Sequence, residues 1–402
     1  MRKPNDDFIL FLLKRSFGLP GAVPASTIDV KAVSRVIQKN GILLTVFPVL
    51  EMLVRETDGE LKTCLEELSA ILRKPYLASM KQSLVQNHEG NEVLTVLSNA
   101  GLSCIALKGW ELRKLYPQTT MRQMADLDIL VKPYDYKTIR PLMDKLGFRS
   151  GSESSWKHDS FKKNEVNVEM HKRLTDDSDR IRAWEKGIWA KAVPTETPHV
   201  FQMSPEDFYI FHFVHLHKDF MNGSLGLRRI VDTWLLYKQN NVNRKTVRDY
   251  LKQFGMLSFH DRMVKLAKAT MGEIEIDRDS EILLNHAFTH GIYGTDKSYK
   301  AGRIAAMGGS LRRGKLRSFL SAVFLPYSRM KTQYPVVEKR PILLPWCWLK
   351  RILHFLRGNM NQNKKKLDYR NVNKADYEEM KRFFEAGGVR KNISCKNNKG
   401  EK

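Results

Sequence analysis

Two aspartates, Asp126 and Asp128, point most directly to chemistry in this sequence. The run DLDILV at 126–131 alternates polar and apolar residues and ends in β-favouring ones, which predicts a strand with both carboxylates on one face. Two such carboxylates repel each other unless a cation offsets their charge. Mg²⁺ binds one or two carboxylates together with substrate phosphates, so the pair suits a nucleotide site. The alternative is a pair of solvated acids where a strand leaves a sheet.

The segments on either side favour the metal interpretation. Upstream, a strand-like apolar run ends on Lys108 and Gly109 before a helix-like segment. This order predicts a place where backbone N–H groups and a lysine can meet phosphate oxygens. Downstream, the alternation of residues 166–171 puts Glu169 and His171 on one face of a second strand. If the two strands are neighbours, Glu169 is a third acid at the metal site.

These residues belong to a longer series of short motifs, which in chain order are Leu107-Lys108-Gly109, Tyr116-Pro117, Arg122, Asp126-x-Asp128-Ile129-Leu130-Val131, Leu146-Gly147-Phe148 and Glu169-x-His171. The series resembles the uncharacterised nucleotidyltransferase family of the polymerase-β superfamily. The resemblance is specific over about residues 101–175 and weaker to about residue 240. It implies a small mixed sheet with helices packed on it, and three carboxylates that bind two Mg²⁺ ions, or Mn²⁺. The ions align a nucleoside triphosphate, such as ATP, with an acceptor.

The resemblance also assigns roles to individual residues. Asp126, Asp128 and Glu169 would be the catalytic metal ligands, and Lys108 with Gly109 would meet the nucleotide phosphates. One departure concerns the residue after the phosphate-loop glycine. Many superfamily members have a serine there, whereas this chain has a tryptophan, Trp110.

Two arginines are further candidates for nucleotide binding. Arg122 stands four residues before Asp126, where its guanidinium could form a structural salt bridge or a bidentate phosphate contact. Arg228 precedes Asp232 by four residues and could form an intrahelical pair with it. The segment around Arg228 also resembles the helical half of the same family, which favours a place for Arg228 facing the triphosphate.

Other side chains leave their roles open. A helix beginning at Ser204-Pro205 carries His212, His215 and His217, for which packing, substrate contact and metal binding are alternatives. The polar hairpin region at 150–165 contains Trp156 and Phe161, which could contact a nucleobase or acceptor, or pack on the sheet.

Periodicity predicts a unit of strands and helices at about 101–200 between two mainly helical regions. Together with the small mixed sheet that the resemblance implies, this gives an α+β fold. The predicted divisions are a helical region at 1–100, a nucleotidyltransferase core at 101–200, a helical region at 201–330 and a basic tail at 331–402. Expected helices of the first region are Phe8–Leu13, Val30–Gln38, Ile42–Leu53, Leu61–Leu72 and Met80–Ala100. This region could form a lid that binds the acceptor or a module that completes the core.

The net charge of +24 favours polyanionic partners, and residues 329–402 contribute half of it. In this tail, the segment 341–357 combines Trp346 and Trp348 with basic and apolar residues. It predicts either an interfacial helix or a core helix with snorkelling bases. A short helix is expected from Ala375 to Phe384, and solvated chain elsewhere.

The four cysteines lack the spacing of a zinc site or a disulfide framework, which fits a reducing cytosol. The apolar run near the N-terminus is too short to span a bilayer. The expected location is therefore cytoplasmic, with peripheral association at an anionic membrane or polyanion through the basic tail.

Two functions follow from these features. The first is transfer of a nucleoside monophosphate from an NTP to an unidentified acceptor hydroxyl on a protein, sugar, small molecule or RNA. The alternative is a non-catalytic basic adaptor that uses the same fold to bind a polyanion or an anionic membrane. Three converging carboxylates argue against the adaptor, since they repel phosphate unless a metal is present.

Overall fold

The computed structural model describes residues 3–23, 28–132, 136–151, 158–175, 179–325, 327, 330, 334, 336–357, 369 and 371–389. The chain divides into two compact units. Unit 1 contains residues 1–217 and 225–293, and unit 2 contains residues 218–224 and 294–402. The sheet belongs to unit 1, and in unit 2 the described elements are helices.

A seven-stranded mixed sheet forms the centre of unit 1, in the order β3-β4-β5-β2-β1-β7-β6. The strands are β1 (Cys104–Ala106), β2 (Leu127–Val131), β3 (Arg149–Ser150), β4 (His158–Lys163), β5 (Val166–His171), β6 (Val193–Pro194) and β7 (Val200–Gln202). β2 lies between β1, which is antiparallel to it, and β5, which is parallel. This mixed sheet with helices before and after it confirms the predicted α+β class.

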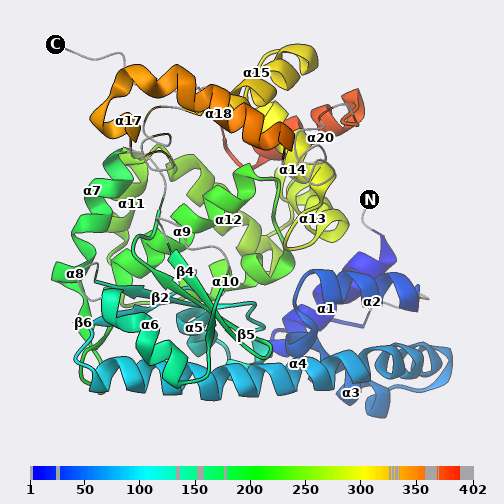
Figure 1. Cartoon of the computed structure of the whole chain (residues 1–402). Helices are drawn as coiled ribbons and strands as arrows, with labels where there is room; N and C mark the ends of the chain where they lie inside the picture. Colours follow the sequence, from blue (N-terminus) through cyan, green and yellow to red (C-terminus); the bar gives the residue numbers. More distant parts are fainter. Residues whose placement is uncertain are drawn as a thin grey trace. The chain divides into compact units, whose positions relative to one another are not determined.

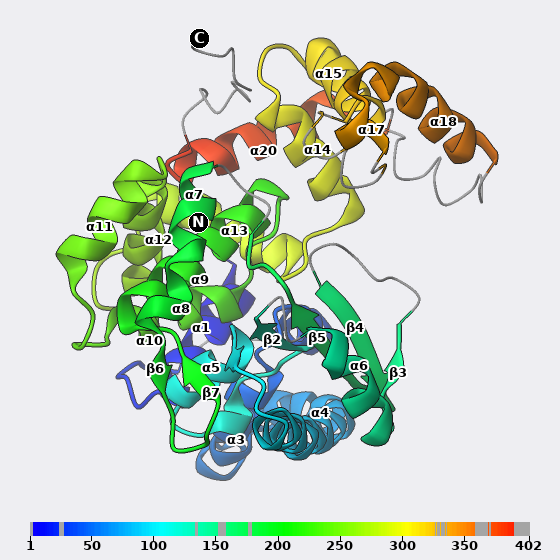
Figure 2. The ribbon, with the colours of Figure 1, turned by 60° about the vertical axis from the view of Figure 1, so that its left-hand side comes forward.

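One face of the sheet is buried in an apolar core, as alternation predicts. Leu127, Ile129 and Val131 of β2 share this core with Val168 of β5 and with residues of the helices α4 and α6 (Tyr136–Lys145). Figures 1 and 2 show the long helix α4 (Gly59–Asn99) running along the sheet. The opposite faces of the same strands are therefore available for polar side chains.

Trp110 and Phe161 belong to this core. Trp110 is buried against α4, where a Cβ at Gly90 would lie 2.4 Å from the indole Cζ3 atom. The Arg113 guanidinium lies 3.6 Å from the centre of a Trp110 ring. Phe161 is 2% exposed. Of the two interpretations of Phe161, the structure supports sheet packing.

Helix α4 differs from the prediction, because it is one helix of 41 residues instead of two. Periodicity separates Leu61–Leu72 from Met80–Ala100, yet the chain stays helical through Pro75. Proline removes the hydrogen bond to the carbonyl of Ile71. Ile71 lies on the exposed side of the helix, where water can solvate that carbonyl.

Three helices precede α4, as expected. They are α1 (Pro4–Ser16), α2 (Val30–Lys39) and α3 (Leu43–Glu56). The apolar run from Phe8 to Leu13 is buried within α1, which confirms it as a core-facing helix.

The remaining helices of unit 1 surround the sheet or follow it: α5 (Gly109–Leu112), α7 (Asp179–Lys186), α8 (Ile188–Lys191), α9 (Pro205–Met221), α10 (Leu227–Tyr237), α11 (Arg244–Gln253), α12 (Leu257–Thr270) and α13 (Arg278–His290). The end of α9, from residue 218, belongs to unit 2. The backbone N–H of Asp207 donates to Ser204 Oγ at 3.2 Å, which confirms the predicted start of α9.

Unit 2 contains α14 (Asp296–Ala306), α15 (Leu311–Val323), α17 (Val336–Lys339), α18 (Leu344–Arg357) and α20 (Lys374–Ala386). The helix expected at 375–384 is present as α20. Phe220 stacks on Phe383 of α20 with ring centroids 4.1 Å apart. A small apolar cluster contains Met330, Val337 of α17 and Cys347 of α18, and so packs these two helices together.

Some predictions lie outside the described residues, namely those on Pro133, Tyr134, Trp156, Lys364-Lys365-Lys366 and Cys395. Cys64, Cys104 and Cys347 are free thiols. In the described part of the chain, no helix has the length and apolar character needed to cross a membrane. The predicted domain limits at residues 100, 200 and 330 stay predictions.

Candidate active site

Strand register places three carboxylates on one face of the sheet. Asp128 of β2 and Glu169 of β5 are Cα partners in a parallel pair. Asp126 lies two residues before Asp128, so the pleat turns both side chains to the same side. One oxygen from each of the three carboxylates lies within 4.8 Å of the others. The structure thus brings together the acids singled out in the sequence, and their role as metal ligands stays a prediction.

Two cationic side chains contact these acids. Lys108 Nζ donates to Asp128 Oδ1 at 2.9 Å. His171 Nε2 lies 2.6 Å from the same oxygen and 3.3 Å from Glu169 Oε2. His171 Nδ1 lies 3.3 Å from the carbonyl oxygen of Arg173, so both ring nitrogens face acceptors, as in an imidazolium. Lys108 and His171 supply the positive charge that lets the acids lie together.

The pKa values of the three acids diverge because their neighbours differ. Burial, helped by the charge of Asp128, raises the pKa of Asp126 to about 6. Burial also opposes ionisation of Asp128, but Lys108 and His171 outweigh it and hold the pKa of Asp128 well below its usual range. The hydrogen bond with His171 lowers the pKa of Glu169. Asp126 is therefore the acid that takes up a proton most readily.

The backbone of Lys108 is strained. Its φ of +43° and ψ of −112° lie in a region that residues with a side chain rarely adopt, at a cost of about 1–3 kcal/mol. This conformation turns the chain from β1 into α5. Because α5 has only four residues, the expected phosphate-binding helix N-terminus is reduced to a single turn. Lys108 and Gly109 are the two residues of this turn predicted to contact phosphate. The ammonium charge of Lys108 therefore offers a stronger attraction than the backbone N–H groups of this short helix.

Gly109 has a packing role that the sequence does not reveal. A Cβ at this position would lie 2.8 Å from Arg122 Nη1 and 3.1 Å from Met124 Cγ. The missing side chain therefore lets the Arg122 guanidinium lie against the turn after Lys108.

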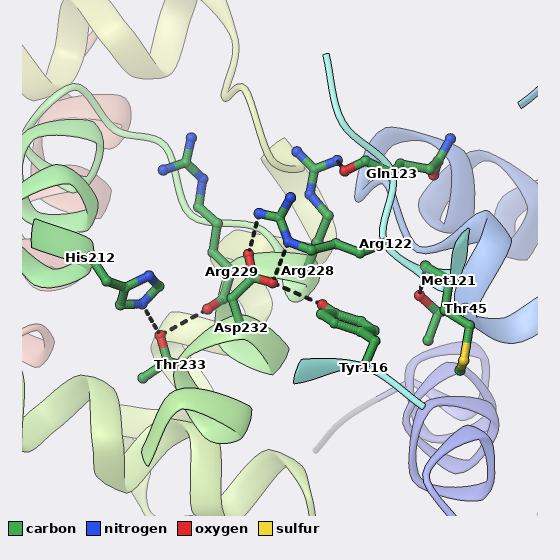
Figure 3. A network of polar contacts seen from close by, with 10 residues as sticks. All are labelled: Thr45, Tyr116, Met121, Arg122, Gln123, His212, Arg228, Arg229, Asp232 and Thr233. Carbon is green, nitrogen blue, oxygen red and sulfur yellow. Dashed lines mark hydrogen bonds and ion pairs between the residues drawn. The ribbon is translucent and has the colours of Figure 1, made fainter. Parts of the chain in front are cut away.

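A buried ion pair joins this turn to helix α10 (Figure 3). Arg122 Nε and Nη2 donate to the two carboxylate oxygens of Asp232 at 2.7 and 2.8 Å, and the Tyr116 hydroxyl donates to Asp232 Oδ1 at 2.9 Å. Arg122 and Asp232 are 7% and 2% exposed. Of the two interpretations of Arg122, the structure supports the salt bridge, since its guanidinium is directed to Asp232 and away from the acids of the sheet.

Arg228 does not pair with Asp232 in the way its i, i+4 spacing predicts. Arg122 and Tyr116 bind both oxygens of Asp232, and the planar fork of Arg122 matches them in bidentate fashion. Arg228 Nη1 instead donates to the carbonyl oxygen of Gln123 at 2.7 Å. The predicted intrahelical pair is wrong, and Arg228 ties α10 to the segment before β2. Its predicted triphosphate contact finds no support in this position.

Three further hydrogen bonds extend this network (Figure 3). Thr45 Oγ1 of α3 donates to the carbonyl oxygen of Met121 at 2.8 Å. His212 Nε2 of α9 lies 2.9 Å from Thr233 Oγ1 of α10, which donates to the carbonyl oxygen of Arg229. Helices α3 and α10 therefore hold the segment that leads into β2, and α9 is tied to α10.

The three histidines of α9 fit a packing role. Burial lowers the pKa of both His212 and His217 to about 4. His217 packs edge-on against Phe259. Within the described residues, no group of potential metal ligands includes His212, His215 or His217.

His158 is a residue that sequence reasoning missed. β4 and β5 are antiparallel, and His158 is the Cα partner of His171. Its Nε2 lies 3.7 Å from Glu169 Oε2. Alternation in a polar hairpin is a weak signal, but pairing this strand with 166–171 would have placed His158 beside the acids.

Comparisons with known proteins agree with this geometry. A family described as uncharacterised nucleotidyltransferase matches residues 26–272, more than half of the chain. None of the curated proteins matches. The solution structure of the antibiotic-resistance factor ANT(2'')-Ia is similar at 13% identity, covering 52% of this chain and 99% of that chain. Its TM-score of 0.26 is too low to carry an argument.

The substitution Asp232→Asn tests the buried ion pair. It leaves the Arg122 guanidinium buried without a counter-charge, so we expect a loss of about 3–5 kcal/mol in the free energy of unfolding. Asp279→Asn is the control, because Asp279 pairs with Arg262 at 2.8 Å where the side chains are 34% and 38% exposed. The control should cost about 1 kcal/mol or less. Equal losses in denaturant titrations of the two variants would contradict a structural role for Asp232.

The raised pKa of Asp126 predicts a pH-dependent effect of Asp126→Asn on stability. Because the folded state holds this proton more tightly than the unfolded state, metal-free protein should lose stability as the pH rises from about 4 to about 6. At pH 7 the variant should therefore be more stable than wild type by about 1–3 kcal/mol, with little difference at pH 4. Denaturant titrations at both pH values measure this. The exposed Asp144→Asn serves as control, and a variant less stable than wild type at pH 7 would refute the charge repulsion.

Proposed function

We propose that this chain, which belongs to the uncharacterised nucleotidyltransferase family, moves a nucleoside monophosphate from an NTP to an acceptor hydroxyl in a Mg²⁺-dependent reaction. Family membership gives the reaction class, nucleotidyl transfer, and a nucleotide as substrate. The observation that supports the metal is the convergence of Asp126, Asp128 and Glu169 beside Lys108. Without a cation, three acids this close would repel a triphosphate.

The residues of the site fit a divalent ion. Mg²⁺ and Mn²⁺ prefer carboxylate oxygens and leave positions for phosphate oxygens and water. Asp126, Asp128 and Glu169 offer such oxygens within 4.8 Å of one another. When bound, two ions would bridge phosphate oxygens and polarise the acceptor hydroxyl.

The proposed roles of the residues come from the family resemblance. Asp126 and Asp128 would hold both ions, and Glu169, on the neighbouring strand, would hold the one nearer the acceptor. Lys108 turns its ammonium group from Asp128 to the leaving phosphates, which the backbone of Gly109 also meets. The acceptor hydroxyl gives up its proton to solvent, and its oxygen forms a bond to the α-phosphorus as the bond from that phosphorus to the β-phosphate oxygen breaks. Pyrophosphate leaves with that electron pair.

Labelled nucleotides test the transfer. Full-length protein is incubated with Mg²⁺, a fractionated cell extract and NTPs that carry a radioactive α- or γ-phosphate. Nucleotidyl transfer should label an acceptor fraction from the α-phosphate and not from the γ-phosphate. Asp128→Asn should lower the rate about 100-fold or more, because it removes charge that holds the ions. The exposed Asp144→Asn should retain the wild-type rate.

Label from the γ-phosphate on the acceptor fraction would show phosphoryl transfer and contradict the proposal. Equal α-label incorporation by wild type and Asp128→Asn would contradict the assignment of the acids.

We extend the proposal to the location of the protein: unit 2 binds peripherally to the anionic cytoplasmic face of a membrane. An apolar stripe lies along α18 and the turn before it. Ile342, Trp346, Leu349 and Leu353 follow one another at intervals of four, three and four residues, so they share one helix face. These side chains are between 41% and 87% exposed. Exposed stripes of this kind with tryptophan are typical of interfacial helices.

Charge favours an anionic surface as the occupant. α18 contains basic residues and no acid, and neighbouring α15 contains Arg312, Arg313, Lys315 and Arg317 and likewise no acid. Such helices gain from both apolar insertion and attraction to anionic headgroups. Of the two interpretations of this segment, the exposure of Trp346 supports the interfacial helix, while Cys347 and Trp348 on its other side pack within unit 2.

Sedimentation with vesicles tests membrane binding. The double substitution Trp346→Ser and Leu349→Ser should lower binding to vesicles rich in phosphatidylserine about tenfold or more, since it removes two inserted side chains. Leu84→Ser, at an equally exposed site on α4, should bind like wild type. Binding should weaken with salt and vanish on neutral vesicles. Equal vesicle binding by the double variant and by Leu84→Ser would contradict the proposal. So would a wild-type protein that binds RNA but not vesicles.

A further inference from the structure

The face of the sheet that carries the three acids also carries two histidines. His158 and His171 are directly opposite each other in the antiparallel pair of β4 and β5, so both imidazoles lie on the same face. Glu169 lies two residues before His171 on that face. The register of three neighbouring strands therefore places Asp128 beside Glu169, and His171 beside His158 two residues further along the same face.

The ligand atoms of this group are spaced for a single ion. Glu169 Oε2 lies 3.3 Å from His171 Nε2 and 3.7 Å from His158 Nε2. One ligand atom from each of the three residues lies within 4.8 Å of the others. A tetrahedral ion with N and O ligands at about 2.0–2.2 Å needs separations of about 3.4 Å. Rotation of the partly exposed His158 ring is enough to close the widest gap.

The surroundings of His171 suit a metal-binding histidine. Its Nδ1 lies 3.3 Å from the carbonyl oxygen of Arg173, which directs Nε2 into the group. Histidines that bind metals usually donate their other N–H to a carbonyl or carboxylate in this way.

We propose that His158, Glu169 and His171 form a second, nitrogen-containing metal seat that selects a first-row transition ion, beside an oxygen-only seat at Asp126 and Asp128. The inference deepens the proposed nucleotidyl transfer and depends on it for its catalytic meaning. Two imidazoles and one carboxylate favour Zn²⁺, Co²⁺ or Fe²⁺ over Mg²⁺, whereas carboxylates alone favour Mg²⁺ or Mn²⁺. Glu169 belongs to both groups of potential ligands, so the acceptor-side ion would lie in the nitrogen-containing seat and the enzyme would use two different metals.

Zinc is the probe for this seat. Full-length protein is loaded with one equivalent of Zn²⁺ without nucleotide, its affinity is measured by competition with a chromophoric chelator, and X-ray absorption counts the imidazole ligands. Wild type should show two imidazoles. His158→Gln should show one and bind Zn²⁺ more weakly by more than the about 10–100-fold that loss of a supporting residue costs.

The matched control is His290→Gln on α13. His290 lies 4.4 Å from His286 between ring centroids, so this pair is a competing zinc site. The control should bind Zn²⁺ like wild type. A loss of affinity in His290→Gln but not in His158→Gln would overturn the proposal, as would a wild-type spectrum without imidazole. A wild-type spectrum without imidazole contradicts the proposal even if a variant does not fold.

Asp126→Asn separates this proposal from the proposed function. It lies outside the nitrogen seat, so it should retain two-imidazole zinc binding while losing Mg²⁺-dependent transfer. Failure of the transfer assay with two imidazoles still present would leave the seat standing and remove the proposed reaction. Nucleotidyl transfer by a protein whose zinc spectrum shows no imidazole would support the proposed reaction and contradict the nitrogen-containing seat.

Discussion

Mutual repulsion among three carboxylates is the constraint on which the rest of this site depends. Strand register brings Asp128 and Glu169 together as Cα partners, and Asp126 directly precedes the strand that carries Asp128. Their charge is balanced from one side by Lys108 and from the other by His171. The strained backbone of Lys108 is the cost of directing that ammonium group at Asp128. Perturbed carboxylates gathered in this way are typical of functional sites, which is why the proposal assigns a cation to them.

The helical part of unit 1 supports the site without contributing to it directly. Asp232 of α10 binds Arg122 and Tyr116, and Arg228 binds the carbonyl oxygen of Gln123. These contacts fix the segment between α5 and β2, and with it the position of Asp126. The arginines that look like phosphate ligands in the sequence thus hold the loop that carries the acids. A residue of a functional motif can therefore have a structural role in the site and need not contact the substrate.

Sequence reasoning succeeded where a local period decides the outcome. Alternation in 126–131 and 166–171 predicted both strands and the faces of Asp128 and Glu169, because pleating fixes side-chain direction. Sequence reasoning failed where two residues that interact lie far apart in the chain. Asp232 could pair with Arg228 on its own helix, and only the tertiary structure brings Arg122 to it with better geometry. Periodicity also predicted two helices, Leu61–Leu72 and Met80–Ala100, where α4 is continuous through Pro75.

Calorimetric titration with a non-hydrolysable NTP analogue, with and without Mg²⁺, tests the central claim most directly. If the three acids hold the ion that presents the triphosphate, wild type should bind the analogue only with Mg²⁺. Asp128→Asn should bind it weakly in either condition, with its melting temperature showing that it is folded. Glu169→Gln should retain much of the affinity if this acid serves the acceptor side. Equal Mg²⁺-dependent binding by wild type and Asp128→Asn would contradict the account.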